Sequence, residues 1–381
     1  MINYFDNSST TKPCQAAIDA FCLAAEQFGN PSSLHRIGLE AEHLLKSARK
    51  DIAALLSAEE KSIFFTSGGT EANNMAILGT AYRRKSIGRH LITTAIEHPS
   101  VLNAFHYLEA EGWQVTYLPV DRCGNISLAE LESALTPKTT LVSIAHVNNE
   151  VGTLQPIREI GKLIRTVAPK CYFHVDCVQS FLKIPIDLKG ACVSLASFSA
   201  HKVHGFKGCG ALYVAPGVNI DAVIHGGGQE RGLRSGTENI PGITAFAAAA
   251  KWNAEQLKKG GKQQLAQMGK LLQDAFSQDD SYTILCPEAF CAPHIISIAR
   301  KGVRGEVLLH ALEQENFYVS TGSACSSHKR SMSHVLQAMG CNDETAQGVI
   351  RISLSHTNTP EQTAELIDAV NRISTELQRY S

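Results

Sequence analysis

Short apolar and β-branched runs alternate with longer amphipathic segments between residues 60 and 216. The runs that predict strands are 62–66, 90–96, 114–118, 140–146, 171–175, 192–198 and 210–214. Segments 71–85 and 157–167, which lie between them, have the apolar spacing of helices. Regular alternation of strands and helices is typical of α/β proteins, so we expect a largely parallel sheet with helices on both faces.

The sequence on either side of this region has a different pattern. Segment 39–56 carries Leu44, Leu45, Ala48 and Ile52 at helical spacing. An alanine-rich helix is expected after Pro241, and the glycines within 258–262 predict a break or turn. From 282 onwards strands and helices interleave less regularly. We therefore predict a large domain over 13–255 and a smaller α+β domain formed by 1–12 and 256–381.

Composition narrows the classes of function. The chain has 381 residues, 44% of them hydrophobic, and a formal net charge of -1, so no basic field indicates nucleic acid as a direct partner. No apolar run approaches the ~20 residues that span a membrane, and the N-terminus does not resemble a signal peptide. We expect a cytoplasmic protein. The 11 cysteines include no CxxC pair, which argues against a zinc site or a disulfide framework.

The first candidate for chemistry is the junction after strand 62–66. Gly68, Gly69 and Thr70 follow that strand and precede a predicted helix. Free N–H groups at a helix start favour an anion, although an ordinary helix cap is the simpler interpretation of these residues alone. The segment lacks the Gly-Lys-Ser/Thr of a Walker loop, so it does not indicate a nucleotide.

Two later strand ends offer a more specific combination. Asp176 ends one apolar strand, and Ser199, His201 and Lys202 follow another. Ligands of open α/β sheets lie beyond the carboxyl ends of the strands, so these groups are expected to converge. A lysine for a Schiff base, an acid for a pyridine nitrogen and an anion cradle are the parts that pyridoxal phosphate requires.

Other polar residues are compatible with the same site. His98 and Asn149 each follow a predicted strand. Considered alone, His98 is more simply interpreted as a surface histidine and Asn149 as a turn residue. Cys325 differs from the other cysteines because small polar residues surround it, which is typical of an exposed loop with an accessible thiol. Arg351 lies in a strand-like run, where an arginine either extends to water or binds a carboxylate.

These residues together resemble the cysteine desulfurases of the NifS/IscS type. That family lies within the class V aminotransferase group of fold-type-I pyridoxal-phosphate enzymes. The resemblance covers nearly the whole chain, and its most specific parts are Ser-Ala-His-Lys at 199–202, His-Val-Asp-Cys-Val-Gln at 174–179, Arg-Gly-Leu-Arg-Ser-Gly-Thr at 231–237 and Gly-Ser-Ala-Cys at 322–325. It implies a large domain with a mostly parallel seven-stranded sheet and a smaller α+β domain that carries the cysteine loop.

The resemblance also implies a role for each matching residue. Lys202 would hold the cofactor as a Schiff base, Asp176 would pair with its ring nitrogen, and His98 would stack on the ring and move protons. Asn149 and Gln179 would contact the ring oxygen. The phosphate would be held by Gly69, Thr70, Ser199, His201 and, from the other subunit of a homodimer, Thr237. Arg351, helped by Asn149, would bind the substrate carboxylate, and Cys325 would be the nucleophile.

The implied reaction converts L-cysteine to L-alanine and leaves the sulfur as a persulfide on Cys325. A sulfur-acceptor protein, such as an iron–sulfur scaffold or a tRNA-thiolation enzyme, would then receive it, and transient iron–sulfur contact at Cys325 is compatible with this role. Selenocysteine lyase and class V aminotransferase are the alternatives on the same scaffold. A non-catalytic relative is a third alternative, although every required position holds a competent residue. Cys177 stands where many relatives carry Ala or Gly, and we interpret it as a packing residue.

Overall fold

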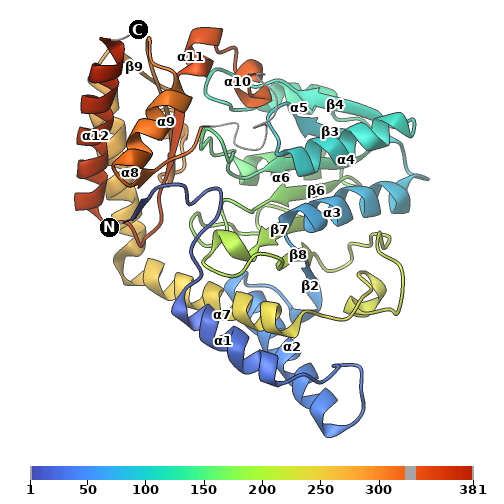
Figure 1. Ribbon diagram of the computed structural model, residues 1–381. Helices are drawn as coiled ribbons and strands as arrows, with labels where there is room; N and C mark the ends of the chain where they lie inside the picture. Colours follow the sequence, from blue (N-terminus) through green and yellow to red (C-terminus); the bar gives the residue numbers. More distant parts are fainter. Residues whose placement is uncertain (1, 322–331, 380–381) are drawn as a thin grey trace.

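A computed structural model describes residues 2–321 and 332–379. Its main feature is a seven-stranded sheet (Figure 1). In spatial order the strands are β2 (Ile63–Thr66), β8 (Gly210–Val214), β7 (Leu195–Ser199), β6 (Tyr172–Asp176), β5 (Thr139–Ala145), β3 (His90–Thr94) and β4 (Gln114–Leu118). Only β8 runs antiparallel to its neighbours, so the expectation of a mostly parallel sheet is confirmed.

One strand begins later than the pattern predicts. The run 192–198 was expected to be extended, but β7 starts at Leu195. Cys192 has a positive φ of 53°, and the Val193 N–H bonds to the Leu188 carbonyl, which closes a turn. The β-branched Val193 is buried against the core, which explains why its local pattern resembles a strand.

Helices cover both faces of this sheet. Adjacent strand residues point to opposite faces, so Leu91 packs with α3 (Gly69–Arg84) and α4 (Pro99–Ala110), whereas Ile92 belongs to the core on the other face. That second core is closed by α2 (Arg36–Leu55), α5 (Leu128–Ala134), α6 (Ile157–Val167) and α7 (Ile240–Gln256). Helix α1 (Gln15–Glu26) packs on the outside of α7.

A second, smaller group of elements has its own core. Its antiparallel sheet has the order β12 (Val349–Ser353), β10 (Ile295–Arg300), β9 (Tyr282–Ile284). Helices α8 (Lys262–Ser277), α9 (Gly305–Gln314) and α12 (Pro360–Gln378) pack around it, with the short α10 (His334–Ala338) and α11 (Asp343–Gln347) nearby (Figure 1). The domain boundaries given above stay a prediction.

The expected break at 258–262 has a different form. Residues Leu257–Gly261 form a π-helical turn that joins α7 to α8, with Gly260 at a φ of 119°. A glycine suits this backbone because other residues rarely adopt such a φ. The two helices therefore meet at a kink instead of a loop.

The N-terminal segment (residues 5–11) links the two sheets. It follows the short strand β1 (Asn3–Tyr4), which pairs with β11 (Phe317–Tyr318). Asp6 forms a bridge with Ser353 of β12, and further along Thr11 donates its N–H to the carbonyl of His201 after β7. The segment thus passes between the carboxyl end of the large sheet and the smaller sheet. No helix of the described residues has the length and apolar character to cross a membrane.

Candidate active site

A cavity of about 620 Å³ lies where β5, β6 and β7 end. Those strands contribute Ala145, Asp176 and Ser199 to its wall. This position agrees with the rule that ligands of open α/β sheets bind beyond the carboxyl ends of the strands. Ten of the residues singled out from the sequence line it: Gly69, Thr70, His98, Asn149, Asp176, Gln179, Ser199, His201, Lys202 and Arg351.

Asp176 is buried, and each of its carboxyl oxygens accepts a hydrogen bond. Its Oδ2 accepts a hydrogen bond from Asn73 Nδ2 at 2.8 Å, and its Oδ1 accepts one from the Val178 N–H at 2.9 Å. Such donors offset the cost of burying a negative charge and fix the direction of the carboxyl group. Asn73 is a functional candidate that the sequence reasoning missed. Its position four residues after Gly69, on the same face of α3, was the available signal.

Lys202 follows β7 through a short 3₁₀ turn (Ala200–Lys202). Its Nζ donates hydrogen bonds to the backbone carbonyls of Ser8 and Ser9, the latter at 2.8 Å. Both acceptors belong to the N-terminal segment, and Gln179 Nε2 also donates to the Ser8 carbonyl at 2.9 Å. The two serines were not singled out from the sequence, because every residue type has a backbone carbonyl and the contact therefore does not depend on the side chain.

The start of α3 approaches the turn after β6 very closely. A Cβ built on Gly69 would lie 2.7 Å from Val178 Cγ2, and Gly68 has a φ of 154°. Both positions therefore require glycine. The close approach directs the first N–H groups of α3 at the cavity, which makes this helix start suitable for an anion.

Two histidines at the cavity are neutral near pH 7. Burial lowers the pKa of His201 to about 4, and neighbouring lysines lower it further. Burial also lowers the pKa of His98, while Asp176 opposes that shift. His98 Nδ1 accepts the Ser100 N–H at 3.1 Å, so the neutral His98 ring carries its proton on Nε2. Its proton position is thereby set by the start of α4.

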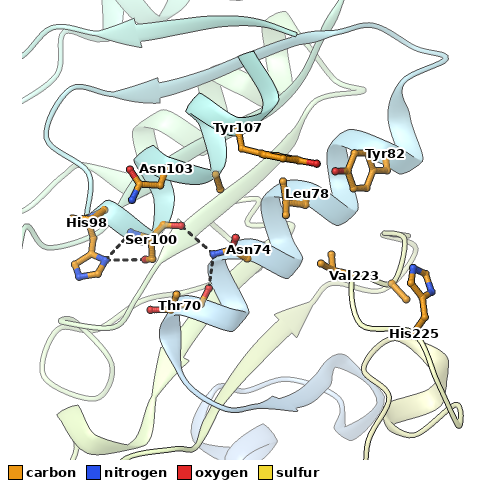
Figure 2. Close-up of a pocket in the computed structure, with 13 residues that line it drawn as sticks. Thr70, Asn74, Leu78, Tyr82, His98, Ser100, Asn103, Tyr107, Val223 and His225 are labelled. Atoms are coloured by element: carbon orange, nitrogen blue, oxygen red, sulfur yellow. Dashed lines mark hydrogen bonds between the residues drawn. The ribbon is translucent and has the colours of Figure 1, made fainter. Parts of the chain in front are cut away.

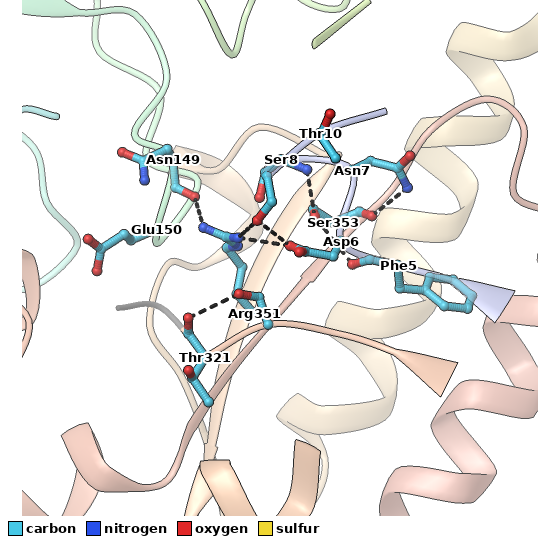
Figure 3. A network of polar contacts seen from close by, with 12 residues as sticks. Phe5, Asp6, Asn7, Ser8, Thr10, Asn149, Glu150, Thr321, Arg351 and Ser353 are labelled. Carbon is cyan, nitrogen blue, oxygen red and sulfur yellow. Dashed lines mark hydrogen bonds and ion pairs between the residues drawn. The ribbon is translucent and has the colours of Figure 1, made fainter. Parts of the chain in front are cut away.

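Arg351 is 3% exposed, so its side chain does not extend to water. Its Nη1 donates to the Asn149 carbonyl at 2.9 Å, and its Nη2 contacts Asp6 Oδ1 at 2.9 Å and Ser9 Oγ at 2.7 Å (Figure 3). Arg351 Nε is buried without a partner among the described residues. The guanidinium is therefore fixed beside the cavity by one carboxylate of its own chain and retains a further donor.

Glu97 is a second residue that the sequence reasoning did not select. It is 1% exposed, and its Oε1 accepts hydrogen bonds from Thr94 Oγ1 and the Ala145 N–H. Burial raises its pKa to about 8, with a smaller contribution from Asp176. Glu97 is thus protonated at neutral pH, directly before His98. A glutamate at the end of a buried strand was the signal in the sequence.

Thr237 is the one described site residue that the structure does not bring together with the rest. Thr237 is exposed and does not line the cavity of its own chain. Cys325 lies outside the described residues. The described residues on either side of it do reach the cavity region, because Ser320 pairs with Arg351 and Met332, Ser333 and His334 line the wall. Cys177 is fully buried, as its interpretation as a packing residue requires.

A second cavity of about 770 Å³ adjoins the first between α3 and α4. The two share Thr70, His98, Pro99 and Ser100. Figure 2 shows Leu78, Tyr82 and Tyr107 along this groove, with His225 on the opposite side. Its wall combines these apolar and aromatic side chains with polar ones such as Asn74 and Asn103.

Known proteins resemble the chain over nearly its whole length. The family described as Aminotransferase class-V matches residues 3–366. "Cysteine desulfurase IscS" of Methanosarcina thermophila is 40% identical, with 99% of this chain and 93% of that protein covered. "NifS/IcsS protein homolog" of Lactobacillus delbrueckii subsp. bulgaricus is 43% identical, with 97% and 96% covered.

Solved structures agree with these relatives. A "NIFS-LIKE PROTEIN" superposes with a TM-score of 0.92 at 38% identity, covering 98% of this chain and 100% of that one. "SspA in complex with cysteine" has a TM-score of 0.81 at 35% identity, covering 93% and 99%. The extent of these matches, together with the strand-end cavity, shows that the chain belongs to the class-V aminotransferase family.

Proposed function

We propose that the protein is a pyridoxal-phosphate-dependent cysteine desulfurase that converts L-cysteine to L-alanine and captures the sulfur on Cys325. The observation that carries this proposal is the convergence of Lys202, Asp176, His98 and Arg351 on one cavity. The names of the relatives and the cysteine complex of one structural neighbour support it.

The described residues fit the cofactor. Gly69 leaves no room for a side chain where the helix start meets the cavity, and Gln179 Oε1 is a buried acceptor without a partner among the described residues. Asp176 would pair with the ring nitrogen, and His98, Asn149 and Gln179 would contact the ring. The phosphate would be held by Gly69, Thr70, Ser199 and His201, and Lys202 would hold the aldehyde carbon. When bound, the cofactor supplies an electron sink that makes the substrate α-proton acidic.

Arg351 is the proposed binding group for the substrate carboxylate. Its guanidinium is already oriented by the Asn149 carbonyl and Asp6, so little conformational freedom is lost when a carboxylate binds. The contact with Asp6 also reduces the net positive charge at this position. A substrate carboxylate therefore has to share Arg351 with Asp6, which favours weak, reversible binding of the amino acid.

Lys202 and His98 are the proposed proton carriers. The carbonyls of Ser8 and Ser9 accept from Lys202 Nζ and therefore stabilise its protonated form, which is the form present after it has removed the α-proton. His98 holds a proton on Nε2 and keeps its ring neutral. The neutral ring can therefore accept a proton from the thiol of Cys325 or of the substrate, and the imidazolium that results can return it.

The sulfur transfer balances without an external oxidant. The Cys325 thiolate attacks the substrate sulfur, so a sulfur–sulfur bond forms while the carbon–sulfur bond breaks, and the carbon takes the electron pair and then a proton. One enzyme thiol and one L-cysteine give one enzyme persulfide and one L-alanine. A sulfur-acceptor protein would then take the outer sulfur from the persulfide.

The proposal includes a homodimer in which Thr237 completes the phosphate site of the partner. Two observations support this arrangement. Thr237 is exposed and does not line the cavity of its own chain, and the groove between α3 and α4 adjoins that cavity at Thr70. A second copy packed on this groove would therefore lie next to the proposed phosphate site.

A single incubation tests the activity. The pure protein with pyridoxal phosphate and L-cysteine should form alanine and enzyme-bound persulfide in equal amounts in the first turnover. Cys325→Ala should lose the persulfide and at least about a hundredfold in rate, as expected for loss of a nucleophile. Cys22→Ala, which removes another exposed thiol, is the matched control and should behave as wild type.

Two outcomes would contradict the assignment. Undiminished sulfide and alanine production by Cys325→Ala would exclude Cys325 as the nucleophile. Amino-group transfer to a 2-oxo acid, or turnover of selenocysteine with no reaction of cysteine, would favour the aminotransferase or the selenocysteine lyase instead.

A further inference from the structure

Two cysteines outside the active site lie on either side of one tight turn. Cys286 precedes and Cys291 follows the 3₁₀ turn Glu288–Phe290. The Phe290 N–H bonds to the Pro287 carbonyl at 3.0 Å, and the Cys291 N–H bonds to the Glu288 carbonyl at 3.3 Å. The turn reverses the chain, so the two thiols are brought back toward each other across it.

Both sulfur atoms converge on consecutive residues of another loop. Thr153 Oγ1 donates to Cys286 Sγ at 3.7 Å, and Thr153 forms a backbone bridge with Cys291. A Cβ on Gly152 would lie 2.8 Å from Cys291 Sγ, so that sulfur packs directly on Gly152. Cys291 Sγ also contacts the Ile295 carbonyl at 3.1 Å and the Val151 carbonyl at 3.7 Å.

This arrangement makes the two thiols unequal. The neighbouring Cys291 side chain lowers the pKa of Cys286, whereas Cys286 and burial raise the pKa of Cys291. Cys286 is 1% exposed, whereas Cys291 is partly exposed. Among the described residues no group of three or more cysteine, histidine or acidic side chains could hold a metal ion, so metal binding does not account for the pair.

We propose that Cys286 and Cys291 form a dithiol that hydrogen peroxide, or another hydroperoxide, converts reversibly to a disulfide. The peroxide transfers one oxygen to the partly exposed Cys291 sulfur and leaves as water, which gives a sulfenic acid. Cys286 then attacks that sulfur, and a second water leaves as the sulfur–sulfur bond forms. Two thiols and one peroxide thus give one disulfide and two waters, and a dithiol reductant restores both thiols.

The position of this pair connects it to the substrate side of the cavity. The Leu154 N–H bonds to the Phe290 carbonyl, and the Ala292 N–H bonds to the Gly152 carbonyl, each at 2.8 Å. Gly152 ends the turn whose Asn149 carbonyl accepts from Arg351. A disulfide would replace the contacts of Cys291 at the base of that turn. The proposed oxidation stands independently of the desulfurase activity, and it is tested without measuring turnover.

The sequence provides a direct assay. Trypsin releases 271–300 as one peptide that contains Cys286 and Cys291 and no other cysteine. The native holoenzyme is treated with a series of hydrogen peroxide concentrations, alkylated with iodoacetamide after unfolding, digested and analysed by mass spectrometry. We expect the peptide to lose both alkylation sites and the mass of two hydrogen atoms, and to regain two alkylated thiols after dithiothreitol. Cys291→Ser should leave one alkylated thiol, at Cys286.

The control is internal to the same sample. Cys14 and Cys22 also share one tryptic peptide, but they cap and occupy α1, eight residues or about 12 Å apart along the axis, which is too far for a disulfide. The peroxide series is extended until Cys22 is oxidised. If 271–300 then still carries two alkylated thiols, or gains oxygen without a cross-link, the proposal is wrong. A cross-link from Cys286 to Cys123, in peptide 123–138, would overturn the pairing equally.

Discussion

At the scale of single residues, the cavity is governed by groups whose charge is set by their neighbours. The carboxyl group of Asp176 accepts hydrogen bonds from Asn73 and a backbone N–H, whereas Glu97, buried directly before His98, is protonated at neutral pH. His98 and His201 are neutral because burial lowers the pKa of each. Asp176 thus lines the cavity beside neutral imidazole rings, so no charged histidine there competes for it with a cationic aromatic ring.

Lys202→Ala is the first prediction at this scale. The variant should bind pyridoxal phosphate without a covalent bond, because Lys202 is the only lysine among the described residues that line the cavity. Borohydride reduction followed by unfolding should leave the cofactor attached to wild type and absent from the variant, as measured by mass spectrometry. Lys207→Ala, which removes an exposed lysine of the same loop, should retain the label. A labelled Lys202→Ala protein would exclude Lys202 as the attachment site.

Glu97 predicts how stability depends on pH. Its pKa is about 8 in the folded protein and ~4.3 in an unfolded chain, so the folded state binds the extra proton between these values. The contribution of Glu97 to the free energy of unfolding is therefore fully present at pH 4 and is lost as the pH rises towards 8. Glu97→Gln should remove this loss, on the order of a few kcal/mol between pH 5 and 8 relative to wild type. Urea unfolding at both pH values measures it, and parallel curves for the two proteins would contradict the prediction.

The lowered pKa of His98 predicts how kcat/KM falls at acid pH. Its pKa is lowered by burial, so the neutral ring persists below the ordinary value of ~6.5. The plot of kcat/KM against pH should therefore retain its plateau through pH 6.5 and fall only at lower pH. In His98→Gln the rate should be reduced by about a hundredfold and that limb should be absent. An acid limb that is unchanged in His98→Gln would assign the titration to another group.

At the scale of elements, the start of α3 and the turn after β6 are fitted to each other. Gly69→Ala should push these two elements apart, because the new methyl group would meet Val178 Cγ2. We expect the affinity for pyridoxal phosphate to fall by about tenfold, equivalent to ~1.4 kcal/mol. Fluorescence titration of the apoprotein measures this. Adding Val178→Ala should restore part of the affinity, whereas an equally weak double variant would show that the contact is not the cause.

The sheet and most of its strand ends were predictable from the sequence, for a physical reason. Buried parallel strands produce apolar runs, and the residue after each run, such as Asp176, is placed at the cavity by the topology alone. Asn73 was not predicted, because its spacing from Gly69 indicates a shared helix face but does not reveal the carboxylate that it contacts. The acceptors of Lys202 are main-chain carbonyls of distant residues, and no local pattern encodes such a contact. The glycines after α7 predicted a break or turn, but the structure has a kink between two helices. Glycine permits either conformation, so the sequence does not distinguish them.

At the scale of the whole molecule, the proposed dimer predicts complementation between two inactive variants. Lys202→Ala and Thr237→Val, mixed and allowed to exchange subunits, should form heterodimers in which one of the two sites has both residues intact. About a quarter of wild-type activity is expected, because half of the dimers are mixed and each has one good site. Lys202→Ala mixed with Asp176→Asn is the matched control and should stay inactive, since both changes lie on the same side of the proposed site. Equal activity in the two mixtures would refute a composite site.

The N-terminal segment has a consequence for how the protein is made. Asn7 Nδ2 bonds to the Ser353 carbonyl across 346 positions of sequence, and the same segment supplies the acceptors of Lys202 and the carboxylate beside Arg351. During synthesis the large sheet can form early, since nascent chains fold from their beginning. The N-terminal segment is translated first, but it can reach its final position only after β12, one of the last strands, has been made. A chain that ended before β12 would lack the Ser353 contact of this segment, so we expect it to position the acceptors of Lys202 poorly and to bind the proposed cofactor weakly.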